Sequence, residues 1–85
     1  MNSRTSPTFS KIPFLGGAVI VTDFADGNFS IRSDGFPTDE YLALMKDLRS
    51  LHGGYYKVEV RSWNFQGEVR DAVVHAISEW SANHG

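Results

Sequence analysis

The sequence predicts a small α+β domain in which a three-stranded antiparallel sheet is covered on one face by two helices. Three observations support this class: a turn-forming Asp26-Gly27 pair between two β-rich runs, two segments with apolar residues at helical spacing, and an alternating segment between these two. The element order is therefore β-β-α-β-α. A right-handed crossover would return the third strand beside the first, which gives a two-layer sandwich with strand order 2-1-3.

The composition supports one folded domain. The 85 residues are 41% hydrophobic and 21% charged, which is enough apolar material for one thin core and too much for a disordered chain. We expect a flexible N-terminal tail over residues 1–10, because this segment is rich in Ser and Thr, and a single α+β domain over residues 11–85. Residues 11–15 are too apolar for a free tail, and we expect them to dock on the domain.

Residues 17–33 are predicted to form a β-hairpin. The Asp-Gly pair favours a two-residue turn, because both central residues of such a turn need a positive φ. This turn would pair Phe24 with Phe29 and Ile20 with Ser33, and directly opposed residues share a face. The apolar face, expected in the core, would hold Ile20, Phe24, Phe29 and Ile31. The opposite face would hold Val19, Val21, Asp23, Ser30 and Arg32.

A helix is predicted to begin at Pro37-Thr38. Thr38 suits the N-cap, and the acidic residues Asp39 and Glu40 complement the positive end of the helix dipole. Gly53-Gly54 is a typical helix end. Apolar residues recur at three- and four-residue spacing, with Leu42 beside them: Tyr41, Leu44, Met45, Leu48 and Leu51.

Residues 55–65 are predicted to form the third strand, and residues 68–82 the second helix. In the strand, the even positions Tyr56, Val58 and Val60 suit the core. In the helix, one stripe of side chains is apolar: Val69, Ala72, Val73, Ala76, Ile77 and Trp80.

The sequence contains no motif that indicates catalysis. Cysteine is absent, which excludes disulfides, thiolate chemistry and cysteine-based metal sites. The nucleophile elbow, the phosphate loop and the dinucleotide fingerprint are absent as well. His52, His75 and His84 lack the spacing of metal ligands. We therefore expect no enzyme activity, no metal and no cofactor. Because no apolar run approaches the roughly 20 residues of a membrane span, we also expect a cytoplasmic protein.

The third strand carries the clearest functional signal. Its odd positions combine aromatic and basic side chains on the face that points away from the core, and this mixture is typical of protein interfaces and of base-stacking surfaces. We expect a partner-binding patch formed with two hairpin residues: Tyr55, Lys57, Arg61, Trp63, Phe65, Arg32 and Val21. The alternative is that the apolar residues of segment 9–15 cover this face as a second small core.

The interpretation that follows is a non-enzymatic protein-interaction domain. Single-stranded nucleic-acid binding is the alternative, and a very small enzyme is the second. The net charge of −2 favours a protein partner, because nucleic-acid binding would be weak and salt-sensitive. A homodimer through a strand edge or a sheet face is a further option. In size and format alone, the chain resembles the small inhibitors that phages and mobile elements direct against host machinery, such as anti-CRISPR proteins, and it shares this format with small ribosome-associated and regulatory subunits.

Overall fold

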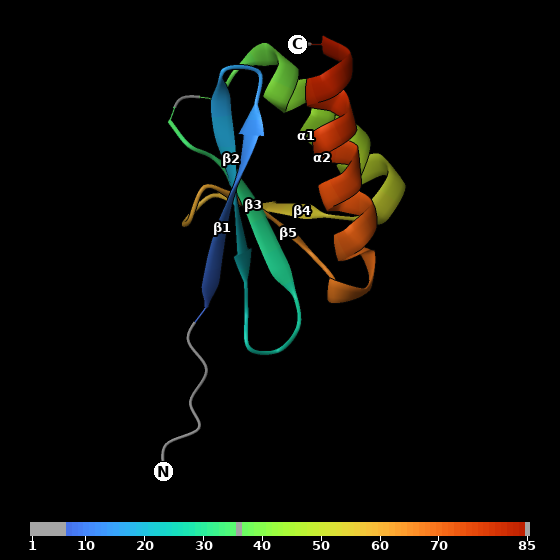
Figure 1. The fold of residues 1–85 in the computed structure, drawn as a ribbon. Helices are drawn as coiled ribbons and strands as arrows, with labels where there is room; N and C mark the ends of the chain where they lie inside the picture. The colour runs from blue at the N-terminus through green and yellow to red at the C-terminus, as the bar shows by residue number, and fades with distance from the viewer. Residues whose placement is uncertain (1–6, 36, 85) are drawn as a thin grey trace.

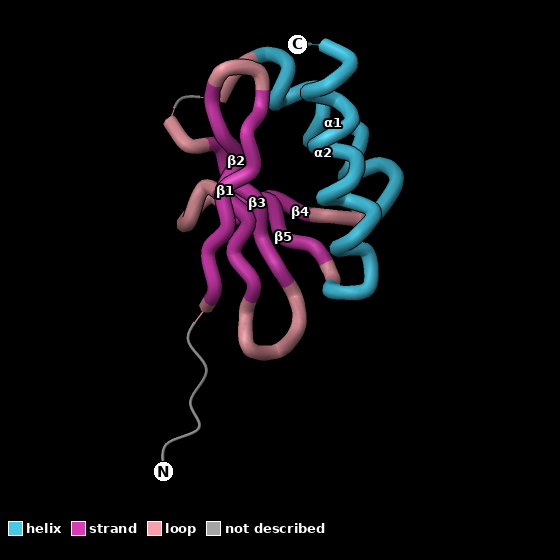
Figure 2. Tube along the Cα trace, viewed as in Figure 1, coloured by secondary structure: helices cyan, strands magenta, loops and turns pink. Residues whose placement is uncertain are grey.

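The computed structural model describes residues 7–35 and 37–84, and it has a five-stranded antiparallel sheet with both helices on one side (Figures 1 and 2). The prediction of an α+β class is confirmed, whereas the predicted three strands and their order 2-1-3 are wrong. The observed strand order is β1-β2-β3-β5-β4. The strands are β1 (Thr8–Phe14), β2 (Gly17–Asp23), β3 (Phe29–Ser33), β4 (Tyr55–Lys57) and β5 (Ser62–Phe65). The helices are α1 (Asp39–His52), the 3₁₀ turn η1 (Gly67–Val69) and α2 (Arg70–His84).

The N-terminal segment forms an edge strand. The predicted tail is wrong at residues 8–10, which belong to β1, while residues 1–6 lie outside the described residues. β1 joins β2 through Leu15 and Gly16, whose φ values of 49° and 85° fit a two-residue hairpin turn. Leu rarely adopts this conformation, so Leu15 itself gives no signal for the turn. β1 thus takes the place beside β2 that we had predicted for the third strand, and it extends the sheet instead of covering its outer face.

Residues 24–28 join β2 to β3, and within them a three-residue loop over residues 25–27 connects Phe24 to Asn28. Phe24 N donates to Asn28 O over 2.9 Å, and Gly27 N donates to Phe24 O over 3.0 Å. Gly27 has a φ of 94°, but Asp26 is not in the left-handed region, as the predicted two-residue turn would require. The loop is the three-residue type, in which a glycine in the left-handed conformation follows an ordinary turn.

This longer loop shifts the strand register by one residue. Val21 pairs with Ile31, and Asp23 pairs with Phe29. A shift of one residue moves every side chain of a strand to the opposite face of the sheet. Val19 and Val21 therefore replace the predicted Ile20 and Phe24 on the face that the helices cover. Both valines are fully buried, whereas Phe24 is 37% exposed.

Residues 55–65 form a hairpin, not the predicted single strand. The chain reverses over residues 58–61, where Arg61 N donates to Val58 O over 3.3 Å and Arg61 has a φ of 50°. Val58 and Val60, which we had placed in the core, are exposed on this turn. Because the chain reverses, β5 lies between β3 and β4, and Phe65 pairs with Phe29.

The predicted boundaries of helix α1 are confirmed. Thr38 Oγ1 accepts a hydrogen bond from Tyr41 N over 3.1 Å, and Gly53 ends the helix with a φ of 75° and a hydrogen bond from its N–H to Arg49 O. The predicted apolar stripe is buried through Leu48, but Leu51 is 75% exposed.

Two polar contacts attach α2 to the sheet. At its first residue, the Arg70 guanidinium forms paired hydrogen bonds of 2.6 and 2.9 Å with the Asp23 carboxylate. Near its other end, Ser81 Oγ accepts a hydrogen bond from Leu15 N over 3.1 Å. α2 thereby covers the core from the side of β1, although Ala72 of its predicted stripe is exposed. The buried core cluster contains Phe14, Val19, Val21, Phe29, Ile31, Tyr41, Leu44, Met45, Leu48, Phe65, Val73 and Ile77.

A pair of charge insertions tests this register. Val21→Asp should abolish the cooperative thermal transition, because an unpaired buried carboxylate costs several kcal/mol, which is comparable with the total stability of a small domain. Phe24→Asp should still unfold cooperatively, because Phe24 is partly exposed at the loop. Thermal unfolding followed by circular dichroism distinguishes the two variants. The register with a two-residue turn predicts the reverse order, and finding that order would contradict the structure.

Candidate binding groove

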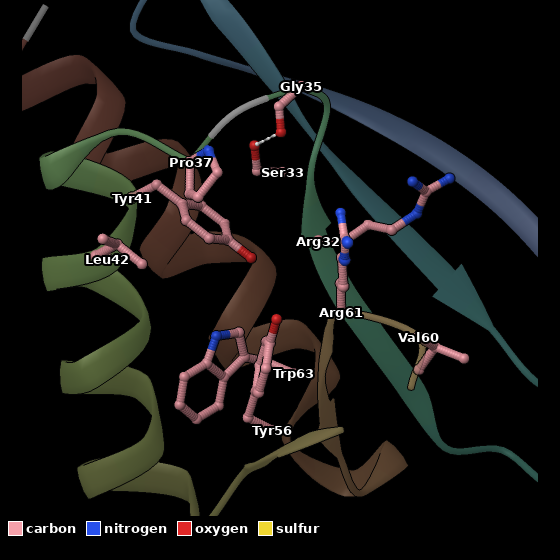
Figure 3. A pocket seen from close by; sticks show the side chains of 10 residues that line it. All are labelled: Arg32, Ser33, Gly35, Pro37, Tyr41, Leu42, Tyr56, Val60, Arg61 and Trp63. Carbon is pink, nitrogen blue, oxygen red and sulfur yellow. Dashed lines mark hydrogen bonds between the residues drawn. The ribbon is translucent and has the colours of Figure 1, made fainter. Parts of the chain in front are cut away.

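A groove of about 840 Å³ opens between the start of α1 and the β4–β5 hairpin. Figure 3 shows the ten side chains that line it. Its volume lies within the range of ligand sites in proteins. Three parts of the chain contribute lining residues: the end of β3 with the start of α1, the strand pair β4–β5, and the turn at residues 58–61.

The floor of the groove is an aromatic pair. Tyr56 of β4 lies directly opposite Trp63 of β5, and their ring centroids are 5.2 Å apart with the planes tilted by 55°. Such a pair contributes about 0.5–1.5 kcal/mol beyond the apolar area that it buries. Trp63 also packs against the core, whereas Tyr56 is 44% exposed. The groove therefore presents an aromatic surface that is held in place by the packing of Trp63 against the core.

Tyr41 forms the wall on the side of α1. The Thr38 cap fixes the first turn of the helix, and Tyr41 extends from this turn so that its hydroxyl points into the groove (Figure 3). Burial, and to a lesser extent the neighbouring Tyr56, raises the pKa of Tyr41 well above its usual value of 10.0. Like that of any tyrosine, the hydroxyl is protonated at neutral pH, where it can both donate and accept hydrogen bonds.

Two arginines supply the only charges along the groove within the described part of the chain. Arg61 extends along the groove, while the guanidinium of Arg32 points away from the aromatic rings (Figure 3). No carboxylate among residues 7–35 and 37–83 forms an ion pair with either arginine; the recorded pairs involve Lys11, Arg70 and His75. Although the chain has a net charge of −2, this surface is positive.

Arg61 occupies a strained position. Its φ of 50° lies in the left-handed region, which costs about 1–2 kcal/mol for a residue with a side chain, and glycine or asparagine are the usual residues there. The turn alone does not explain an arginine at this position. Strained residues often occur at functional sites, and this position therefore supports a role for the Arg61 side chain.

The structure brings together only part of the predicted patch. Arg32, Arg61 and Trp63 all line the groove. Tyr55 and Lys57 lie on the opposite face of β4, where they line a second, more polar hollow of about 610 Å³. Val21 and Phe65 are buried in the core, at 0% and 4% exposure, although Phe65 also contributes to the wall of this second hollow. The correction follows from the shifted register for Val21 and from the pairing with β3 for Phe65.

Among the lining residues that the prediction missed are four large side chains, Tyr41, Leu42, Tyr56 and Val60. Tyr41 and Tyr56 were assigned to the core because their apolar spacing fits it, and Val60 was assigned there by strand alternation. Leu42 lies beside the buried stripe of α1 and is 49% exposed. An apolar residue next to an already complete core stripe was the one signal that could have indicated a second apolar surface on this helix.

The chemistry of the groove suits binding. Its lining contains no carboxylate and no imidazole among the described residues, and Ser33 donates its hydroxyl hydrogen bond to Gly35 O over 2.8 Å. Within the same part of the chain, no three His, Asp or Glu side chains come together as a metal site would require. Aromatic faces, hydroxyls and guanidinium groups recognise ligands through stacking, hydrogen bonds and charge.

No protein-family model, no curated protein and no solved structure matches the chain. The groove is therefore the main basis for inferring a function. In the part of the chain that the structure describes, neither helix combines the length and the apolar character needed to cross a bilayer.

The burial of Tyr41 predicts a specific loss of stability at high pH. Above pH 10 the unfolded chain releases the Tyr41 proton while the folded chain retains it, so the free energy of unfolding falls as the pH rises. One such group contributes a slope of about 1.4 kcal/mol per pH unit. Urea unfolding between about pH 9 and pH 11.5 should show that Tyr41→Phe lacks this contribution. Tyr55→Phe, which changes an exposed side chain, is the control and should keep it. Equal slopes for the wild type and Tyr41→Phe would contradict the burial of this hydroxyl.

Proposed function

We propose that the chain is a small non-enzymatic binding domain that holds a protein partner in the groove between α1 and the β4–β5 hairpin. The observation that carries this proposal is a group of exposed apolar side chains that line one groove together with Trp63. Three of the eight large apolar residues that are exposed in the described chain, Leu42, Tyr56 and Val60, line this groove, next to the half-buried Trp63. Contiguous apolar surface of this kind is uncommon on a monomer unless it binds something.

The composition of the groove supports a protein partner. Trp, Tyr and Arg are the residues that most often dominate the binding energy of protein interfaces, especially where they lie together in a pocket that excludes water. Here Trp63 and Tyr56 form the floor and Arg61 lies at the rim. The fixed first turn of α1 and the hydrogen-bonded hairpin hold these side chains in place, which reduces the entropy lost on binding.

Single-stranded nucleic acid is the second candidate, because aromatic rings beside arginines also stack on bases. Such binding draws most of its affinity from a series of phosphate contacts. Among the described residues, the groove supplies two cationic side chains, and Lys57 lies on the opposite face of the hairpin. With a net charge of −2 over the chain, the long-range field also opposes a polyanion. These considerations favour the protein partner.

Two matched substitutions on α1 test the proposal. Leu42→Asp places a carboxylate in the groove, while Leu51→Asp places one on the same helix outside it, and both side chains are exposed in the wild type. Both variants should keep the wild-type melting temperature within a few degrees. In affinity capture from cell lysate, Leu42→Asp should lose the partner that the wild type and Leu51→Asp retain.

The same experiment can refute the proposal. A partner captured equally well by all three proteins binds somewhere other than the groove. Trp63→Ala is a less suitable probe, because Trp63 also packs against the core and its truncation would lower stability as well as binding.

A further inference from the structure

We propose that the groove recognises an acidic peptide segment, with a large apolar side chain seated on the aromatic floor and a neighbouring carboxylate bound to Arg61. The inference rests on the proposed protein-binding function and specifies the chemistry of the partner. Three observations lead to it: the unpaired charge at the rim, the strained backbone of Arg61 and the aromatic side chains of the floor.

The positive charge of the groove indicates that the group bound there is negatively charged. Elsewhere in the described chain, Lys11 pairs with Asp34 over 3.0 Å and Arg70 pairs with Asp23. Arg32 and Arg61 have no such pair in the described residues, and the groove contains no carboxylate of its own. A guanidinium next to an apolar surface binds a carboxylate through two parallel hydrogen bonds, a geometry that lysine does not offer. The groove is therefore complementary to an acidic group.

The backbone at Arg61 singles out this arginine. The turn at residues 58–61 closes through the hydrogen bond from Arg61 N to Val58 O, and this geometry places Arg61 in the left-handed region. Asparagine would adopt that conformation with less strain. The side chain of Arg61 extends along the groove from this turn (Figure 3), and strained residues are often found at functional sites.

The floor determines the neighbouring residue of the partner. Tyr41, Tyr56 and Trp63 line the same part of the groove, where their rings are apolar and the Tyr41 hydroxyl points into the space between them (Figure 3). An aromatic or long aliphatic side chain fills such a space, and a single well-packed anchor of this kind supplies much of the affinity of a peptide. A peptide with both features meets the groove with an apolar contact and a charged contact a few residues apart.

Selection from a random peptide library on the immobilised domain tests the proposal. Peptides that bind the wild type but not Leu42→Asp should be enriched in a large apolar residue with Asp or Glu close by. One enriched peptide is then synthesised, and its affinity is measured by fluorescence anisotropy against three variants. Arg61→Asn and Arg61→Glu should bind it about tenfold more weakly or worse. Lys57→Glu makes the same charge change as Arg61→Glu on the opposite face, and it should bind nearly as the wild type does.

The same variants also provide the control for correct folding. Arg61→Asn should melt at or above the wild-type temperature, because asparagine suits the left-handed turn, so its loss of binding cannot be attributed to unfolding. An equal loss of affinity for Lys57→Glu and Arg61→Glu would reduce the effect to the overall charge and overturn the proposal.

The remaining outcomes separate this inference from the proposed function. Groove-dependent peptides without acidic enrichment would overturn the inference and leave the proposed function standing. Failure to obtain any peptide that depends on Leu42 would overturn both. Two further results would overturn the inference, because each would identify a different ligand of the groove. The first is binding of a single-stranded oligothymidine, at about 150 mM salt, that Arg61→Glu abolishes. The second is a dimer in sedimentation experiments that Leu42→Asp dissociates.

Discussion

Three hairpin turns, each with a residue in the left-handed conformation, decide which side chains of the sheet face the helices. These positions are occupied by Leu15 and Gly16 in the first turn, with φ values of 49° and 85°, by Gly27 in the second, with 94°, and by Arg61 in the third, with 50°. Because side chains alternate along a strand, a turn that is one residue longer or shorter would exchange the two faces. The turn at Gly27 places Val21 and Phe29 against the helices, and the turn at Arg61 places Tyr56 opposite Trp63. Both the core and the groove depend on these turns.

The groove exists because the two helices cover the sheet unequally. α2 is attached at both ends, through Arg70 to Asp23 and through the hydrogen bond from Leu15 N to Ser81 Oγ, and it covers the side of the sheet near β1. The start of α1 stands beside the β4–β5 hairpin without filling the space between them (Figure 3). Two aromatic side chains that line this space, Tyr41 and Trp63, also pack in or against the core. The same packing that stabilises the domain therefore holds the candidate binding surface rigid.

Local signals predicted α1 well, since its N-cap, its acidic first turn and its terminal glycine are all encoded within a few residues. The sheet was harder to predict. An Asp-Gly pair fits both a two-residue and a three-residue loop, and the wrong choice moved Phe24 into the predicted core. Residues 58–61 contain no Gly, Asn or Pro, so nothing marked the turn between β4 and β5. Of the groove, Arg32, Arg61 and Trp63 were identified, while Tyr41 and Tyr56 were hidden because an apolar pattern does not distinguish a core residue from a groove residue.

Chemical-shift mapping by NMR tests most directly whether this groove is the binding surface. The isotope-labelled domain is titrated with a peptide selected on the wild type, and the backbone amides and the indole N–H of Trp63 are followed. We expect the largest shifts at Trp63, Tyr56, Leu42 and Arg61, with little change at Lys57 on the opposite face of the hairpin. Shifts concentrated at Tyr55 and Lys57, or along the free edge of β1, would contradict the assignment of the groove as the binding surface.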